Sequence, residues 1–342
     1  MSTAETKKSK SLLGTILEKV PGIILLFVVG YISKIIASYV PHMEYVLFAI
    51  LIGLIIGNTM KIPELFIPGI DTYELWLKLG IVVLGARLVL QNVLKIGKVG
   101  IILVLLEISV SLIVVEFLAK KFNVSNKLGS LLAMGTGICG VSAIIGATPA
   151  IDVDEEESGL AIATVLIFSA VTVFLYPIIG EIVEMSNQIF GFWAGLAVDN
   201  TAESLATGFA FSEKAGQIAT ITKLSRNALM GVIILAYALF YANKGATQKV
   251  EHKGKFVWQK FPKFLIGFLI LSLLSTLGFF SAEQITDMKH LYKWIFMLSF
   301  AGVGFRTDFE KMKEIGLKSF FVGFGGEVVV SIATLITLYF IF

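Results

Sequence analysis

The residues Gly135-Thr136-Gly137-Ile138-Cys139-Gly140-Val141-Ser142 lie inside a long apolar run from Leu131 to Ile151. A helix this rich in glycine should be weak, because each interior glycine costs up to about 1 kcal/mol relative to alanine. In a bilayer, an unwound backbone is tolerated only where protein or an aqueous cavity surrounds it. The stretch therefore predicts a broken helix at a binding site. The alternative is that the glycines let two helices pack closely, as small residues do in membranes.

The composition places the whole chain in a membrane. Of its 342 residues, 56% are hydrophobic and only 15% are charged, and the mean hydropathy is +0.86. No soluble domain of this length has such a composition. The single cysteine, Cys139, excludes a disulfide framework. The histidines His42, His252 and His290 are too far apart in sequence to predict a metal site or a catalytic triad, and the net charge of +3 indicates no nucleic-acid partner.

The apolar runs predict an all-α polytopic membrane protein with ten or eleven transmembrane helices. Residues 1–19 are polar and are not followed by a signal-peptide cleavage site, so we expect a cytoplasmic tail and then one transporter domain over 20–342. Acidic residues from Asp152 to Glu157 should begin the sixth helix, with Asp152 and Glu155 at capping-box spacing. The expected helices are Val20–Val40, Tyr45–Gly57, Leu75–Leu94, Val99–Leu118, Leu131–Ile151, Gly159–Gly180, Ile189–Ser212, Ala215–Tyr241, Phe264–Phe280, Leu291–Phe305 and Gly316–Phe342.

Lysine and arginine are concentrated in alternate loops of this arrangement. If the N-terminus is cytoplasmic, the basic tail and the segments 120–127, 244–263 and 306–318 all face the cytoplasm, as the positive-inside rule requires. The bias predicts a cytoplasmic N-terminus. A re-entrant hairpin at either glycine-broken segment would change the orientation of everything downstream.

A short pattern occurs twice in the chain. Leu84-Gly85-Ala86-Arg87 precedes Lys95-Ile96-Gly97, and Val303-Gly304-Phe305-Arg306 precedes Glu314-Ile315-Gly316. Each copy leads into an apolar helix that carries a glutamate, Glu107 or Glu327, and an odd number of expected crossings separates the copies. The pattern predicts inverted repeats over about 43–183 and 188–342, with discontinuous helices near the midplane, although so short a match also arises by chance.

The same repeat predicts two charge pairs, Arg87 with Glu107 and Arg306 with Glu327. If Gly97 marks a turn between antiparallel helices, Arg87 and Glu107 lie at equal depths of ~15 Å. An unpaired charge in hydrocarbon is costly, so a partner is expected. The alternative is that Arg87 extends to the interface and Glu107 faces a separate cavity.

A second polar segment, Asp199-Asn200-Thr201-Ala202-Glu203-Ser204, lies at the centre of the run Ile189–Ser212. Such groups at membrane depth usually mark a substrate or ion path. We expect Asp199 and Glu203 to bind the coupling ion, because burial favours protonation of a carboxylate. Asn200 and Glu203 also have capping-box spacing, so the segment alternatively only starts a helix after a break. The expected substrate-binding residues are Gly135, Thr136, Gly137, Cys139, Gly140, Ser142, Asn200, Thr201 and Ser204.

The chain resembles the YeiH-like sulfate exporter family. The residues that carry the resemblance are Gly135 to Ile144, Glu155-Glu156-Glu157, Trp193-Ala194-Gly195 and Gly208-Phe209-Ala210-Phe211-Ser212. The resemblance implies a bacterial inner-membrane protein of ten or so helices, related in fold to cation/proton antiporters and bile-acid transporters. It also implies export of sulfate or a sulfonate. Where many relatives have a histidine-aspartate pair, this chain has Val198-Asp199, so no role of that histidine applies here.

These observations favour a secondary active transporter that exports a small anion, such as sulfate or an organosulfonate. A half-helix N-terminus suits an oxyanion, and Arg87, Arg226 or Arg306 could add charge. The expected partners are the lipid bilayer, the anionic substrate and H+ or Na+ as the coupling ion, with a homodimer as the candidate assembly. No ATP-binding motif, cofactor site or metal site is evident. The alternatives are an intramembrane enzyme using Asp199 and Glu203, four apart on one helical face, and an anion channel.

Overall fold

The computed structural model describes residues 12–40, 44–88, 90–245, 247, 250–307 and 317–342. Every regular element within these residues is a helix, which confirms the expected all-α membrane class. Five helices are long and apolar enough to cross a bilayer, namely Ile16–Tyr39, Val93–Lys121, Glu155–Ile182, Glu213–Asn243 and Leu317–Ile341. The pair Lys253–Lys260 and Phe264–Thr276, bent by 70°, forms a sixth if it is one span. The other expected crossings are shorter, more polar or interrupted helices.

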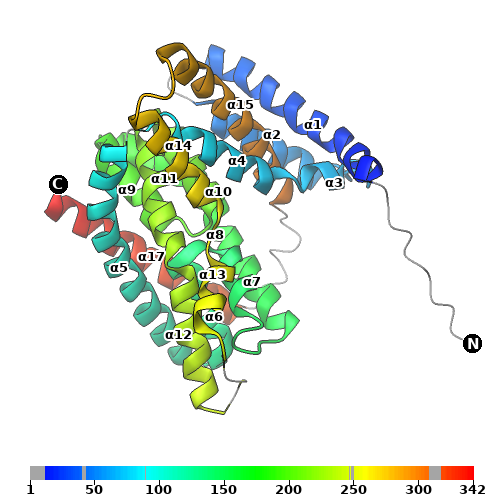
Figure 1. The fold of residues 1–342 in the computed structure, drawn as a ribbon. Coiled ribbons are helices and arrows are strands. Elements are labelled where there is room, and N and C mark those ends of the chain that lie inside the picture. The colour runs from blue at the N-terminus through cyan, green and yellow to red at the C-terminus, as the bar shows by residue number, and fades with distance from the viewer. Residues whose placement is uncertain (1–11, 41–43, 89, 246, 248–249, 308–316) are drawn as a thin grey trace, which may run out of the picture.

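The helices form two groups that lie side by side (Figure 1). The outer group packs around α15 and consists of α1 (Leu12–Tyr39), α2 (Tyr45–Thr59), α3 (Ile67–Ile70), α4 (Tyr73–Gly85), α14 (Phe264–Thr276) and α15 (Ala282–Arg306). The inner group consists of α5 (Leu90–Lys121), α6 (Asn126–Met134), η1 (Gly135–Cys139), α7 (Val141–Ala147), α8 (Glu155–Ile182), α9 (Asn187–Ala197), α10 (Thr201–Phe211), α11 (Glu213–Ala228), α12 (Met230–Asn243) and α17 (Leu317–Ile341). The short helix α13 (Lys253–Lys260) packs on α12.

Small residues set the packing inside the outer group. Gly53 on α2 faces Gly304 on α15, and a Cβ on Gly304 would lie only 2.2 Å from the carbonyl oxygen of Ile50. The two backbones therefore touch, as expected where van der Waals packing drives helix association in a membrane. The first helix of this group begins at Leu12, so residues 12–19 belong to α1 rather than to a polar tail, while residues 1–11 lie outside the described residues.

The expected turn at Gly97 is wrong. The outer helix α4 ends at Gly85, and α5 then runs without interruption from Leu90 to Lys121 through Gly97. A Cβ on Gly97 would meet no atom within 4 Å, so glycine there makes neither a turn nor a close contact. The second copy of this part of the repeat, Glu314-Ile315-Gly316, lies outside the described residues.

The glycine-rich run Leu131–Ile151 and the run Ile189–Ser212 with its polar centre are both broken helices, as the sequence predicts. The run from Leu131 to Ile151 passes from α6 through the π-helix η1 and turns at Gly140 into α7. The second run is divided into α9 and α10. The acidic segment after the first run, Asp152 to Glu157, begins α8 as expected. The N-cap of α8 is Asp154 rather than Asp152, and the Asp154 side chain accepts the backbone N–H of Glu157.

Candidate functional site

The two broken helices meet at their breaks. Gly140 has φ +62°, which disfavours any residue with a side chain, and a Cβ there would lie 3.1 Å from the Cα of Asn200. Asn200 is the N-cap of α10, and its side chain accepts the backbone N–H of Thr201 at 2.9 Å. Asn200 therefore begins the helix as expected, but its side chain accepts the N–H of Thr201 rather than that of Glu203, as it would in a capping box. Glycine is required at position 140 because the chain must turn directly against the second break.

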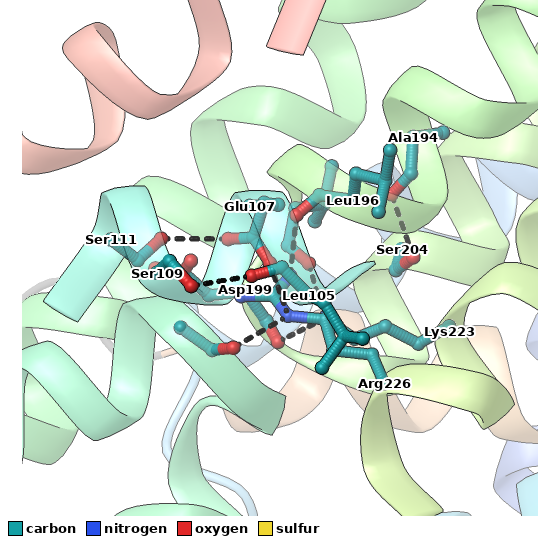
Figure 2. Close-up of polar contacts among 12 residues, drawn as sticks. Leu105, Glu107, Ser109, Ser111, Ala194, Leu196, Asp199, Ser204, Lys223 and Arg226 are labelled. Carbon is teal, nitrogen blue, oxygen red and sulfur yellow. Dashed lines mark hydrogen bonds and ion pairs between the residues drawn. The ribbon is translucent and has the colours of Figure 1, made fainter. Parts of the chain in front are cut away.

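Two buried cations on α11 bind the backbone carbonyls that the breaks leave outside helical hydrogen bonding (Figure 2). Arg226 donates from Nε to the carbonyl of Gly137 at 3.0 Å and from Nη1 to the carbonyl of Leu196 at 2.5 Å. Lys223 donates from Nζ to the carbonyls of Val198 and Asp199, both at 2.6 Å. A buried carbonyl without a donor is costly, so these side chains stabilise both breaks.

The guanidinium of Arg226 also forms a fully buried ion pair. Its Nε lies 3.2 Å from Oε2 of Glu107 on α5, and the two side chains are 0% and 2% exposed. The hydroxyl of Ser111, one turn along α5, donates to the other oxygen of Glu107 at 2.7 Å. Arg226 therefore holds α5, η1 and α9 together at one point, and removal of any partner would leave buried charge or carbonyl groups unpaired.

Glu327 on α17 reaches the same centre. Its carboxyl interacts with that of Asp199, and its Oε1 lies 3.4 Å from the hydroxyl of Tyr176 on α8. Ser331, one turn further on, accepts hydrogen bonds from Tyr176 at 2.8 Å and from Trp193 at 3.0 Å. Among the described residues, both carboxylate oxygens of Asp199 and Oε2 of Glu327 have no hydrogen-bond partner. Two acceptor groups that face each other need a proton or a cation between them.

The charges of this centre do not balance. Four buried carboxyl groups surround two buried cations, and all six residues are at most 4% exposed. Full ionisation would leave two negative charges in excess, which is costly in a low-dielectric interior. We call this set the buried charge cluster, which consists of Glu107, Asp199, Glu203, Glu327, Lys223 and Arg226.

A cavity of ≈ 380 Å³ lies between the two helix groups, beside the buried charge cluster. The inner group contributes Cys139, Ser142, Asn200, Thr201 and Asn227, and the outer group contributes residues of α4 and α14, among them Tyr73, Glu74, Lys78 and Phe264. Asn227 donates to the hydroxyl of Thr201 at 3.0 Å, whereas its Oδ1 is buried without a partner among the described residues. The cavity can therefore hold a small molecule against the first turn of α10.

Four of the predicted substrate-binding residues line this cavity, namely Cys139, Ser142, Asn200 and Thr201. The others are buried in the framework behind it. The carbonyl of Gly137 binds Arg226, Ser204 donates to the carbonyl of Ala194, and Gly135 packs against Ile144 and Val165. Thr136 and Gly140 are also buried among the inner helices. Substrate contact remains a prediction for all of them.

Asp199 and Glu203 are both buried beside the cavity, at 1% and 4% exposure. They do not share a helical face, because Asp199 lies in the break and α10 begins at Thr201. This geometry removes the helical pairing on which the enzyme alternative was based. The predicted role of the two carboxyls in ion coupling is still a prediction.

The predicted charge pairs are wrong. Arg87 pairs with Glu213 and donates to the hydroxyl of Tyr292, while Glu107 pairs with Arg226. Without a turn at Gly97, Arg87 lies near one end of α5 and Glu107 lies about 25 Å further along it. Arg306 pairs with Asp71 at 3.3 Å at the surface, whereas Glu327 contacts Tyr176. Glu107 and Glu327 nevertheless both reach the buried charge cluster.

Sequence reasoning missed the central residues Lys223, Tyr176, Trp193 and Ser331, and it assigned Arg226 only a general role. Lys223 and Arg226 did carry a signal, because they are three residues apart in an otherwise hydrophobic span. Charges in such a span usually have buried partners. Tyr176 and Ser331 are ordinary residues of apolar helices that no local pattern distinguishes, and Trp193 stood only in a motif of the family resemblance, without a role.

The chain is similar to a group of bacterial membrane proteins. The family model described as Conserved hypothetical protein 698 matches residues 21–323. A UPF0324 membrane protein of Nitratidesulfovibrio vulgaris is 31% identical and covers 90% of this chain and 89% of its own length. A UPF0324 membrane protein of Streptococcus agalactiae is 32% identical, with 90% and 92% covered, and one of Clostridium tetani is 29% identical, with 89% and 92% covered. No solved structure matches the chain.

The matches extend over both helix groups and include the two broken helices and α11. A family model that spans most of a chain, together with relatives above 30% identity over nearly the full length, defines membership. The chain therefore belongs to the Conserved hypothetical protein 698 family, the YeiH-like UPF0324 membrane proteins.

Proposed function

We propose that the protein is a secondary active transporter of a small anion, with sulfate and organosulfonates as the leading substrates. The observation that carries this proposal is the cavity between the helix groups, whose inner wall includes the first residues of α10. The first N–H groups of a helix lack acceptors within the helix and bear a positive partial charge, so they attract oxyanions. A cavity between two helix groups is also where a rocking or sliding motion would expose a ligand alternately.

The charges around the cavity agree with this substrate class. Lys78 and Lys263 lie on its outer wall, and the acidic Glu74 is held in an ion pair with Lys78 at 2.9 Å. The volume of ≈ 380 Å³ suits a tetrahedral anion with some water or a small sulfonate. The resemblance to a sulfate exporter family favours the same class.

The buried charge cluster supports coupling to a cation gradient. Asp199 precedes the N-cap of α10 directly, and Glu203 lies in the first turn of that helix. A carboxylate at either position repels an anion in the cavity, and its protonation removes this repulsion. Cation binding and anion binding are therefore linked through the same few residues.

The first test is a thermal-shift screen of the purified protein against sulfate, sulfonates, other inorganic anions and dicarboxylates. A ligand that binds only the folded state raises the unfolding temperature. A small anion that stabilises the protein selectively would support the proposal, and stabilisation by none of the four groups would contradict the substrate class.

A second test separates a carrier from a channel. Proteoliposomes loaded with the unlabelled anion should accelerate uptake of the labelled anion if the protein is a carrier. A pH or sodium gradient should drive the same uptake, and Asp199→Asn should abolish the dependence on that gradient. Gradient-driven uptake that persists in both Asp199→Asn and Glu203→Gln would refute the coupling role.

A further inference from the structure

Three buried backbone carbonyls lie at the C-terminal end of α9 and directly after it. They belong to Leu196, in the last turn of α9, and to Val198 and Asp199, in the break. In transporters with discontinuous helices, carbonyls at the C-terminal end of a half-helix coordinate the coupling sodium ion. The partial negative charge of the helix end adds to this preference for a cation.

Fixed cations of the protein already occupy these carbonyls. The ammonium of Lys223 lies 2.6 Å from the carbonyl oxygens of Val198 and Asp199, and it is 0% exposed. Arg226 binds the carbonyl of Leu196 at 2.5 Å. Both side chains come from α11, which packs mainly on α9, α10 and α5 of the same inner group.

We propose that Lys223 takes the position of a sodium ion at the break between α9 and α10, and that the coupling ion is therefore a proton. This inference rests on the proposed transport function and specifies its coupling ion. A hydrated sodium ion would have to displace a buried ammonium from two short hydrogen bonds. Sodium and lithium should consequently have no specific site at this break in the unaltered protein.

The titratable side chains around Lys223 include carboxyls that can bind protons. The surrounding titratable side chains are Glu107 on α5, Cys139 on η1, Asp199 at the break, Glu203 on α10, Arg226 on α11 and, next to Asp199, Glu327 on α17. The two carboxyls in excess of the buried cations can be neutralised by two protons. Asp199 and Glu327 are suited to this, because they face each other with oxygens that lack partners in the described chain.

The experiment measures sodium binding and needs no transported substrate. Binding of radioactive sodium and the unfolding temperature are compared in sodium and potassium chloride at equal ionic strength. The unaltered protein should bind no sodium specifically. Lys223→Ala removes the ammonium and frees the carbonyls of Val198 and Asp199, so it should bind sodium and unfold roughly 3 °C higher in sodium than in potassium. Lys223→Ser adds an oxygen ligand and should bind at least as well.

The matched control is Lys214→Ala, which removes an exposed lysine from the same helix and should show no sodium effect. Specific sodium binding by the unaltered protein would overturn the inference, and so would the absence of sodium binding in both Lys223 variants. If these variants fold only when salt is present, recovery in sodium but not in potassium supports the inference, and recovery in neither overturns it. Uptake of the anion driven by a sodium gradient would refute the coupling ion while upholding secondary transport.

Discussion

The two ends of α11 join the helix groups in different ways. At one end, Glu213 pairs with Arg87 and with Lys289 and Lys293 of α15, and these side chains are 25% to 37% exposed. At the other end, about 21 Å away, Asn227 lines the cavity. The groups are therefore joined by charges at the Glu213 end and separated by a cavity at the Asn227 end.

The two ends differ in the free energy needed to separate their ion pairs. Half-exposed ion pairs exchange protein partners for water at little cost, whereas the buried pair of Arg226 and Glu107 cannot separate without large desolvation penalties. The Glu213 end is thus suited to opening, and the broken helices beside the cavity are suited to staying fixed. A transporter that exposes one site to two sides needs this division between moving and rigid parts.

The largest expected effect comes from breaking the rigid end. Arg226→Met should lower the free energy of unfolding by about 3–5 kcal/mol, because it leaves Glu107 charged and unpaired in the interior. We expect little folded protein in size-exclusion profiles and a large drop in unfolding temperature. Adding Glu107→Met should recover part of this loss, since the carboxylate that lost its partner is then removed as well. No recovery would show that the bonds to Gly137 and Leu196 dominate instead.

Gly140→Ala tests the same end through the backbone. Its φ of +62° and the approach to Asn200 should make alanine cost about 1–3 kcal/mol. Gly97→Ala is the matched control, because it lies within continuous helix with open space around it and should be neutral or stabilising by up to about 1 kcal/mol. Equal effects in thermal unfolding would mean that Gly140 does not need its left-handed conformation.

Glu213→Gln removes the ion pairs at the Glu213 end of α11. It should lower the free energy of unfolding by about 1 kcal/mol, in the range of a partly exposed pair. The loss should shrink as salt is added, because screening already weakens the pairs of the unaltered protein. Glu74→Gln is the control, an exposed i,i+4 pair with Lys78 worth about 0.3–0.5 kcal/mol. A cost for Glu213→Gln that does not depend on salt would contradict the comparison of the two ends.

The smallest expected effect tests whether a residue of the cavity wall contributes to anion binding. Ser142→Ala should leave stability unchanged and weaken binding of the stabilising anion by about 0.5–1.5 kcal/mol, roughly 2- to 10-fold. Ser109→Ala removes a hydroxyl from the exposed face of α5 and should change neither property. Isothermal titration of both variants provides the measurement. Equal affinities in the two would remove Ser142 from the binding site.

Local features such as helix breaks and caps were predictable from the sequence, whereas contacts between residues far apart in the chain were not. The break at Gly140 was predictable because a cluster of glycines weakens any helix, and Asn200 as a cap was predictable from its side chain alone. The partner of Glu107 was not, because the choice between Arg87 and Arg226 depends on how α5 and α11 pack. Gly97 misled for a related reason, since a single glycine in a buried or membrane helix costs little enough to be tolerated.

The reactivity of the Cys139 thiol can measure access to the cavity. Its thiol belongs to the only cysteine of the chain, lies on the cavity wall and contacts the sulfur of Met230 at 3.3 Å. It is 2% exposed, so a maleimide too polar to cross the bilayer should react only when the groups separate far enough to admit it. Labelling rates from each side of the membrane would then record which side the cavity faces, without any engineered residue.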